Sequence, residues 1–320
     1  MKKIEAILII LAFGVSLLSC KKNNDDTTLP SLSGFSINTA TPFVREGTTQ
    51  VFRLDLSQLT TSDRSTPGPL GVAWHITGSA RDTVTLDVKT SNPPYSVTLD
   101  KTGNYTVTCF LFSVDEKYYG TSVATSFSVI NPETALDGLD GEEIITIGGH
   151  PYFALRAGGL TWMGQNLYGT PAGRDYKDCE VVSEIFGRYY TWEEARSVCP
   201  DGWRLPTAQE FDTALGSVAG DLMVKAMFQD IEMWPYWPQV KITNAFKFNA
   251  IPTGYMDLTT ESLMYGYQDY ACWWTADELE DVDMGVFRYL YKDQPAIMKG
   301  KGSKTSLALN VRCVKEISED

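Results

Sequence analysis

Short alternating runs of apolar residues recur through residues 31–131 and constrain the fold of this region more than any other feature. In each run the apolar side chains occupy every second position, which places them on one face of a β-strand. The runs are about ten residues apart and are separated by Gly, Pro, Asn and Asp, as in domains of short antiparallel strands. The apolar positions are Phe52, Leu54 and Leu56; Val72, Trp74 and Ile76; Val84, Leu86 and Val88; Tyr95, Val97 and Leu99; Tyr105, Val107, Cys109 and Leu111; and Phe127 and Val129. We therefore expect an all-β sandwich over residues 31–131.

The string from Asp100 to Val107 resembles the turn and strand found late in Ig-like and PKD-like domains. In such domains the tyrosine, here Tyr105, caps a corner by a hydrogen bond to the backbone. Cys109 has no second cysteine within the sandwich, and we expect it to be buried and unreactive. Because the region carries no catalytic constellation, we interpret this Ig-like sandwich as a spacer.

The first residues of the chain have the features of an export signal. Two lysines, Lys2 and Lys3, precede an apolar run from Ile7 to Leu18. The run matches the apolar region of a signal peptide and is short for a membrane-spanning helix. An ordinary secretory leader or a short membrane anchor is the alternative reading.

The end of this leader, Leu17-Leu18-Ser19-Cys20, resembles the lipobox of bacterial lipoproteins. The resemblance implies that residues 1–19 are removed and that Cys20 is lipidated, with several acyl chains giving stable anchoring. Residues 20–30 are polar at their start and are expected to form a flexible tether. The charged residues after Cys20 are similar to the surface-export tethers of Bacteroidetes lipoproteins. We expect an outer-membrane lipoprotein at the cell surface.

Charge and cysteine content narrow the partners and the chemistry. The net charge of −13 argues against nucleic-acid binding, which requires neutralisation of phosphates. Of the six cysteines, Cys20 is assigned to lipid, and the remaining odd number leaves at least one thiol free. The chain has no CxxC pair and only two histidines, so we expect no zinc site. We assign no metal-ligating residue and no cofactor from the sequence.

A second region of different composition follows a turn-rich linker over residues 132–144. Two strings, Thr191 to Glu194 and Thr207 to Glu210, have the T-x-x-E pattern of a helix capping box. The first predicts a helix that ends at Cys199 before Pro200. The second predicts a helix whose buried stripe, at helical spacing, consists of Phe211, Ala214, Leu215 and Val218. Strand patterns return beyond residue 240 and end in the alternation of Leu307, Leu309, Val311 and Cys313, so we expect an α+β domain over residues 145–320.

Six strings in this region, in order and at sensible spacing, resemble one family, the Fibrobacter succinogenes major paralogous (FISUMP) domain. They are Gly159 to Leu167, Phe186 to Trp192, Cys199 to Thr207, Phe246 to Gly254, Trp273 to Thr275, and Asn310 to Val314. The resemblance implies a C-type lectin-like fold, and most members of the family have no assigned activity. C-type lectin-like folds tie the first helix to the last strand by a disulfide, which implies a Cys199–Cys313 bridge here. Whether Cys179 and Cys272 also pair stays open.

Aromatic residues outside the family strings are the candidate ligand-binding residues. Trp234, Tyr236 and Trp237 lie among prolines, and Tyr265 and Tyr267 lie in a later loop that also contains Tyr270. Rings held on loops can stack on the apolar faces of sugars. The alternative is that these rings pack the long loops of the domain. Five tryptophans inside the family strings are expected in the core: Trp162, Trp192, Trp203, Trp273 and Trp274.

Calcium binding and catalysis are the two other kinds of chemistry on which the sequence bears. The acidic loop from Asp277 to Asp283 could hold calcium, but its spacing is not that of an EF-hand, and a solvated loop is the alternative. No GxSxG elbow, HExxH helix or phosphate loop occurs, so we expect no catalytic residues. The sequence therefore predicts a non-catalytic domain that binds a glycan or a protein at the cell surface. The alternatives are a structural or adhesin component of a fimbria-like assembly and a glycan-acting hydrolase with paired carboxylates.

Overall fold

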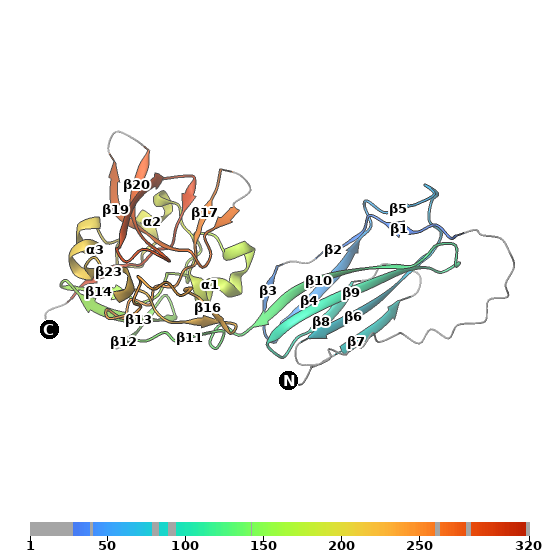
Figure 1. Cartoon of the computed structure of the whole chain (residues 1–320), viewed down its shortest axis with the longest axis horizontal. Coiled ribbons are helices and arrows are strands. Elements are labelled where there is room, and N and C mark those ends of the chain that lie inside the picture. Colours follow the sequence, from blue (N-terminus) through green and yellow to red (C-terminus); the bar gives the residue numbers. More distant parts are fainter. Residues whose placement is uncertain are drawn as a thin grey trace, which may run out of the picture.

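The structure is a computed structural model that describes residues 28–38, 41–78, 83–88, 94–141, 143–259, 263–279 and 283–317. Figure 1 shows two lobes, an N-terminal lobe of strands and a C-terminal lobe that also contains helices. The leader, Cys20 and most of the expected tether lie outside the described residues, as do Glu280 and Asp281 of the acidic loop. Within the described ranges no helix is long and apolar enough to cross a membrane.

The described part of the N-terminal lobe contains strands and no helix, and it encloses one apolar core. A five-stranded sheet has the order β3 (Phe43–Arg45), β10 (Thr121–Ile130), β9 (Gly103–Ser113), β6 (Leu70–Gly78) and β7 (Thr83–Val88). A second sheet has the order β2 (Ser36–Asn38), β4 (Thr49–Asp55) and β8 (Tyr95–Thr98), and β1 (Leu32–Ser33) pairs with β5 (Thr60–Thr61). All pairs are antiparallel except β3 with β10. Each alternating run of the sequence contributes to one of these strands.

Side chains from both sheets form the core of this lobe. Trp74 and Val107 are fully buried there, beside Cys109, whose thiol pKa is raised to about 12 by burial. The Tyr105 hydroxyl donates to the carbonyl oxygen of Lys101 at 2.9 Å, as expected for a corner tyrosine. Cys109 is therefore a buried residue whose thiol stays protonated at neutral pH.

The C-terminal lobe combines four small sheets with short helices. The helices are α1 (Glu180–Phe186), α2 (Trp192–Val198) and α3 (Ala208–Leu215), with 3-10 turns at Tyr176–Asp178 and Ala219–Asp221. The first sheet has the order β12 (Glu143–Ile147), β13 (His150–Ala157), β14 (Leu160–Met163) and β23 (Val314–Glu316). The second has the order β19 (Tyr270–Leu279), β20 (Met284–Tyr291) and β21 (Met298–Ser303), and the third has the order β18 (Leu263–Tyr265), β17 (Tyr255–Asp257) and β22 (Leu307–Ala308). The fourth has the order β11 (Leu136–Asp137), β15 (Met227–Phe228) and β16 (Ile231–Glu232). All of these ladders are antiparallel.

Both predicted capping boxes are present and start α2 and α3. The Thr191 and Thr207 hydroxyls accept from the backbone N–H three residues later, and the glutamates there bond back. The predicted stripe on α3 is wrong at its last position, because Gly216, with φ of 72°, ends the helix. Val218 lies beyond the helix and is half-exposed.

The alternating strand predicted at the end of the chain is also corrected by the structure. Only Leu307–Ala308 and Val314–Glu316 form ladder strands, and the residues between them have isolated bridges or irregular backbone. Asn310 and Arg312, expected on the outer face, are as buried as Val311. The polar members of this segment point into the lobe because they hydrogen-bond to its backbone.

The Cys199–Cys313 disulfide is confirmed. Cys199 follows the last residue of α2, its Cα lies 5.9 Å from that of Cys313, and the two are 114 residues apart in the sequence. Cys179 and Cys272 are both free and buried, so they do not pair with each other. Burial raises the pKa of both thiols.

The two lobes are in direct contact. Ile130, at the end of β10, is 1% exposed and belongs to an apolar cluster of the C-terminal lobe. The ring of Phe43 lies 5.8 Å from that of Phe228, and Arg45 forms an ion pair with Glu184 of α1. The segment expected as a linker includes β11, which pairs with β15 of the C-terminal lobe. The connection is therefore part of the packed structure.

Candidate ligand-binding site

The aromatic residues singled out in the sequence have different environments. Trp234 is 1% exposed, and its indole N–H donates to the carbonyl oxygen of Ala250 at 2.7 Å. The half-buried ring of Tyr267 packs on the rings of Tyr176 and Phe186, each 5.8 Å away. Both were expected in a ligand-binding surface, and both are corrected to packing residues, because their loops turn these rings toward the lobe interior.

Tyr236 and Trp237 remain at the surface. Tyr236 is 81% exposed and Trp237 is half-buried. Both line a cavity of about 260 Å³ between their loop and the end of β20. Lys292, which follows β20, places its ammonium nitrogen 5.8 Å from the centroid of the Trp237 ring.

Tyr265 belongs to a larger group of rings that we call the aromatic platform. The platform consists of Tyr255, Tyr265, Tyr270, Phe287, Tyr289 and Tyr291. Tyr265 is 44% exposed and stacks on Tyr255 with centroids 5.9 Å apart. Tyr270 lies at the centre, 5.9 Å from Tyr255, 6.0 Å from Tyr289 and 4.5 Å from Tyr291. The rings thus form a connected surface.

Strand register explains why these rings meet. In the β19–β20 ladder Tyr270 pairs with Tyr291 and Cys272 with Tyr289, and directly opposed residues share one face of a sheet. In the β17–β18 ladder Tyr255 pairs with Tyr265. A bridge between Gly254 and Ala271 holds β17 beside β19 and so joins the two groups of rings.

A glycine beside the platform makes room for one of its rings. Gly300 pairs with Phe287 in the β20–β21 ladder. A Cβ atom at Gly300 would lie 2.2 Å from the Phe287 ring, far inside contact distance. Only glycine therefore allows this ring to lie against the backbone of β21.

The platform borders a cavity of about 330 Å³. Four of its rings line the cavity together with Cys272, Leu307, Leu309, Lys299 and Gly300. The Lys299 ammonium lies 2.8 Å from Asp212, to which Arg288 also donates. The bond from Arg288, helped by that from Lys299, holds the pKa of Asp212 at about 2. Lys299 is therefore already ion-paired, and the other described residues of the lining are uncharged.

The hydroxyls of Tyr255 and Tyr270 are neutral hydrogen-bonding groups at physiological pH. Burial raises the pKa of Tyr270, and the neighbouring tyrosines raise it further. Burial is also the main cause of the raised pKa of Tyr255. The platform can therefore stack on apolar faces while its hydroxyls donate to and accept from a polar ligand.

Sequence reasoning found only part of this platform. Tyr265 and Tyr270 were noted in a loop, although both belong to strands. Phe287, Tyr289 and Tyr291 were missed. Their spacing of two in β20 is the pattern that places rings on one face of a strand, and it could have identified them.

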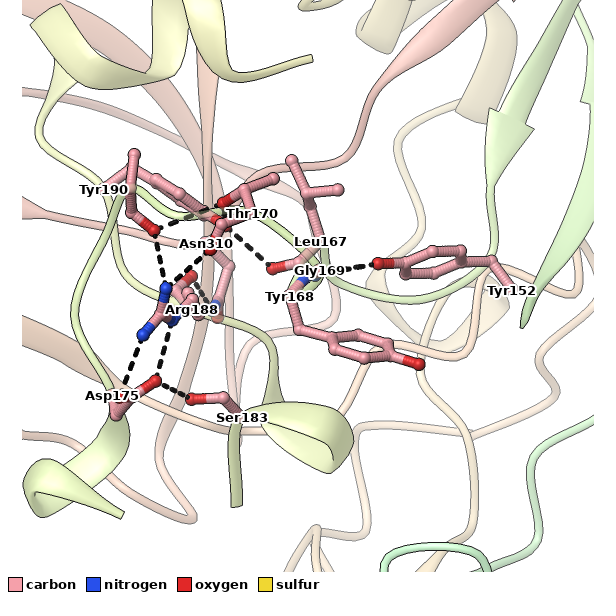
Figure 2. A network of polar contacts seen from close by, with 11 residues as sticks. Tyr152, Leu167, Tyr168, Gly169, Thr170, Asp175, Ser183, Arg188, Tyr190 and Asn310 are labelled. Atoms are coloured by element: carbon pink, nitrogen blue, oxygen red, sulfur yellow. Dashed lines mark hydrogen bonds and ion pairs between the residues drawn. The ribbon is translucent and has the colours of Figure 1, made fainter. Parts of the chain in front are cut away.

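A network of polar contacts in the C-terminal lobe surrounds Arg188 (Figure 2). The guanidinium donates to both carboxylate oxygens of Asp175, at 2.8 and 3.0 Å, and to the carbonyl oxygens of Thr170 and Ala172. Ser183 donates to the same carboxylate at 2.6 Å. Burial opposes ionisation of Asp175, but the bonds from Arg188 and Ser183 outweigh it and lower the pKa.

The remaining bonds of this cluster also stay within the protein. Figure 2 shows Tyr190 beside Thr170 and Leu167. The Tyr190 hydroxyl lies 2.9 Å from the Thr170 hydroxyl and 3.3 Å from the carbonyl oxygen of Leu167. Asn310 donates to the carbonyl oxygen of Arg188 at 3.0 Å. The cluster fastens residues 167–175 to α1 and to the end of the chain. It is a structural network whose donors and acceptors are already used.

The tryptophans of the family strings are mostly in the core, as expected. Trp162, Trp192, Trp273 and Trp274 are at most 1% exposed. Trp203 differs because it is half-buried. The ammonium nitrogen of Lys315 lies 5.1 Å from the centroid of its ring. Trp203 lies at the edge of the core, packed against the apolar cluster that includes Cys313.

The acidic loop has structural bonds where it is described. Asp277 accepts from the backbone N–H of Ala208 at 2.6 Å, at the start of α3, and Glu278 forms an ion pair with Lys304. No group of three or more metal-binding side chains occurs within the described part of the chain. These contacts give the first acidic residues of the loop a role in packing.

Comparison with known proteins gives one match over the C-terminal lobe. The sequence model of the family described as Fibrobacter succinogenes major domain matches residues 155–315. A search of curated proteins finds no match. The crystal structure of a CARDB domain from Pyrococcus furiosus in complex with di-metal ions is similar at 10% identity and a TM-score of 0.21, covering 34% of this chain and 100% of that chain. A TM-score of this size carries no argument about fold or function.

Proposed function

The chain belongs to the Fibrobacter succinogenes major domain family. From this starting point we propose that it is a non-catalytic module that binds a glycan at the cell surface. The observation that carries the proposal is the aromatic platform beside its cavity of about 330 Å³. Sugars present apolar C–H faces to aromatic rings and hydroxyls to polar groups. A platform of stacked rings that also carry hydroxyls offers both kinds of contact.

Binding without catalysis is supported by the chemistry of the cavity lining. Among the described residues, Lys299 is the one charged side chain of the lining, and it is paired with Asp212. Glycoside hydrolysis requires two carboxylates across the scissile bond. The described residues of this lining include no carboxylate, which favours a binding site over a hydrolase.

We further propose the finer folds of the two lobes. The corner formed by Tyr105 and the two facing sheets support an Ig-like N-terminal domain. The disulfide from the end of α2 to Cys313 supports a C-type lectin-like C-terminal domain. In this arrangement the Ig-like domain holds the binding domain away from the membrane.

Location at the membrane is proposed from the lipobox at Cys20. Changing Cys20 to serine is expected to prevent lipidation and to release the protein from the membrane, because the lipobox cysteine is the residue that would be acylated. Detergent phase partitioning of the variant and the natural protein measures this. Unchanged membrane association of the variant would contradict the lipoprotein proposal.

The glycan proposal is tested at Tyr289. A glycan array probed with the full-length protein in detergent identifies a neutral ligand, and calorimetry then gives its affinity. Replacing Tyr289 with alanine removes one stacked ring and is expected to weaken binding about tenfold or more, since stacking contributes about 1–3 kcal/mol per ring. Tyr119, half-exposed in the N-terminal lobe, is the matched control, and its alanine variant should bind normally. Equal affinity of the Tyr289 variant and the control would reject the platform as the site.

A further inference from the structure

The cavity beside Tyr236 and Trp237, which we call the loop cavity, has a composition different from that of the platform. Besides apolar residues it is lined by three lysines, Lys225, Lys241 and Lys292, and by one carboxylate, Glu232. We propose that the loop cavity binds the acidic group of an anionic sugar, a carboxylate or a sulfate. This inference rests on the proposed function and names its ligand class, an anionic glycan.

The charge balance of the cavity supports an anion. The whole chain carries −13, yet lysines outnumber carboxylates three to one in this lining. Lys292 is paired with Asp269 at 2.6 Å. Lys225 and Lys241 form no ion pair with any residue in the described ranges. Two ammonium groups are therefore available to a ligand in a region of local positive charge.

The loop cavity also provides a surface for a sugar ring. Trp237, Pro235 and Val240 form an apolar wall beside the lysines. The indole N–H of Trp237 is buried and has no hydrogen-bond partner among the described residues, whereas that of Trp234 donates to a carbonyl oxygen. Buried donors in native proteins are usually paired. This donor is closed to solvent, so the contact that Trp237 offers a ligand is the face of its ring.

The loop that forms the cavity is held in place before any ligand binds. Gln239 donates to the carbonyl oxygen of Asp293 at 2.9 Å, after the end of β20. Gln268 donates to the carbonyl oxygen of Glu232 at 3.0 Å. A loop fixed at both ends loses less conformational entropy when it binds a ligand.

The position of the loop cavity ties it to the aromatic platform. Lys292 and Asp269, which bond to each other, are the chain neighbours of Tyr291 and Tyr270. The rings of Tyr291 and Tyr270 lie 4.5 Å apart in the platform. Lys292 therefore lies at the end of the β19–β20 ladder that carries these two rings, and a glycan that extends past this end would present its acidic group to the lysines.

The test compares ligands that differ only in charge. Tetragalacturonate is compared with its methyl ester, and a κ-carrageenan tetrasaccharide, whose only acidic groups are sulfates, with its neutral desulfated form, each titrated into the full-length protein. A combined Lys225→Gln and Lys241→Gln variant is expected to weaken binding of the acidic probe about tenfold or more, because hydrogen bonds to charged groups are among the stronger ones. Its affinity for the uncharged probe should change by less than about twofold. The acidic probe that responds identifies the group as carboxylate or sulfate.

A matched control removes the same charge elsewhere. The combined Lys117→Gln and Lys301→Gln variant loses two exposed lysines outside the loop cavity and should bind the acidic probes normally. Equal binding of charged and uncharged probes, or equal weakening by both double variants, would overturn the inference. If neutral glycans then still bind in a way that depends on Tyr289, the proposed function stands without the anionic specificity. If no glycan of either kind binds, both fail.

Discussion

Replacing both Cys199 and Cys313 with alanine is expected to lower the free energy of unfolding by about 4–5 kcal/mol. The bridge closes a loop between residues 114 apart in sequence, and without it the unfolded chain gains the entropy of that loop. The closed loop contains every residue of the platform. Urea denaturation of the natural protein and the variant, both under oxidising conditions, measures the loss.

A reductant supplies the control for this prediction. The natural protein should lose stability when reduced, whereas the double variant should show the same denaturation midpoint with and without reductant. The free thiols at Cys109, Cys179 and Cys272 are buried and occur in both proteins, so their contribution cancels. A natural protein whose midpoint does not respond to reduction after denaturation and refolding would contradict the prediction.

Replacing Arg312 with leucine is expected to cost about 4 kcal/mol or more of stability. The guanidinium is 1% exposed and donates to Asn166 Oδ1 at 2.7 Å and to the backbone carbonyl oxygens of Met163, Phe248 and Asn249. Burial lowers the pKa of Arg312 far below its ordinary value, so the charge itself is costly. The carbonyl groups stay buried when the side chain is removed, and their lost bonds outweigh the relief of that cost.

Two further variants make the Arg312 result specific. Lysine at this position keeps a cation but not the planar set of five donors, and it should recover less than half of the loss. Arg156, whose side chain is 64% exposed and pairs with Glu143 at 3.4 Å, is the control, and its leucine variant should cost less than about 1 kcal/mol. Urea denaturation compares the three. A similar cost for the Arg156 and Arg312 leucine variants would reject the structural role of the buried guanidinium.

Local signals in the sequence predicted the helices that carry such signals. The capping boxes at Thr191 and Thr207 identified α2 and α3, because both bonds of the motif are made within four residues. α1 was not predicted. Its N-cap residue, Cys179, makes no side-chain capping bond, so the helix depends on tertiary packing of Val182 and Phe186.

The candidate site depended on information that is not local. Trp234 and Trp237 are three residues apart in one proline-containing loop, yet only the first is in the core. The direction of a ring on a loop is set by what the loop packs against, which the sequence pattern does not state. The platform likewise arises from the pairing of Tyr270 with Tyr291 and from the approach of Tyr255, which strand register and tertiary bridges determine.

The contact between the lobes governs how a pulling force would pass through the protein. β10 leads directly to the junction and pairs with β9 over most of its length and with β3 at its end. A force applied along the chain at Ile130 acts parallel to these ladders, so their hydrogen bonds share the load in shear and do not open one after another. Because Ile130 is also buried in the C-terminal lobe, the junction resists rotation as well as extension. We therefore expect the N-terminal lobe to resist unfolding when the chain is pulled at the junction.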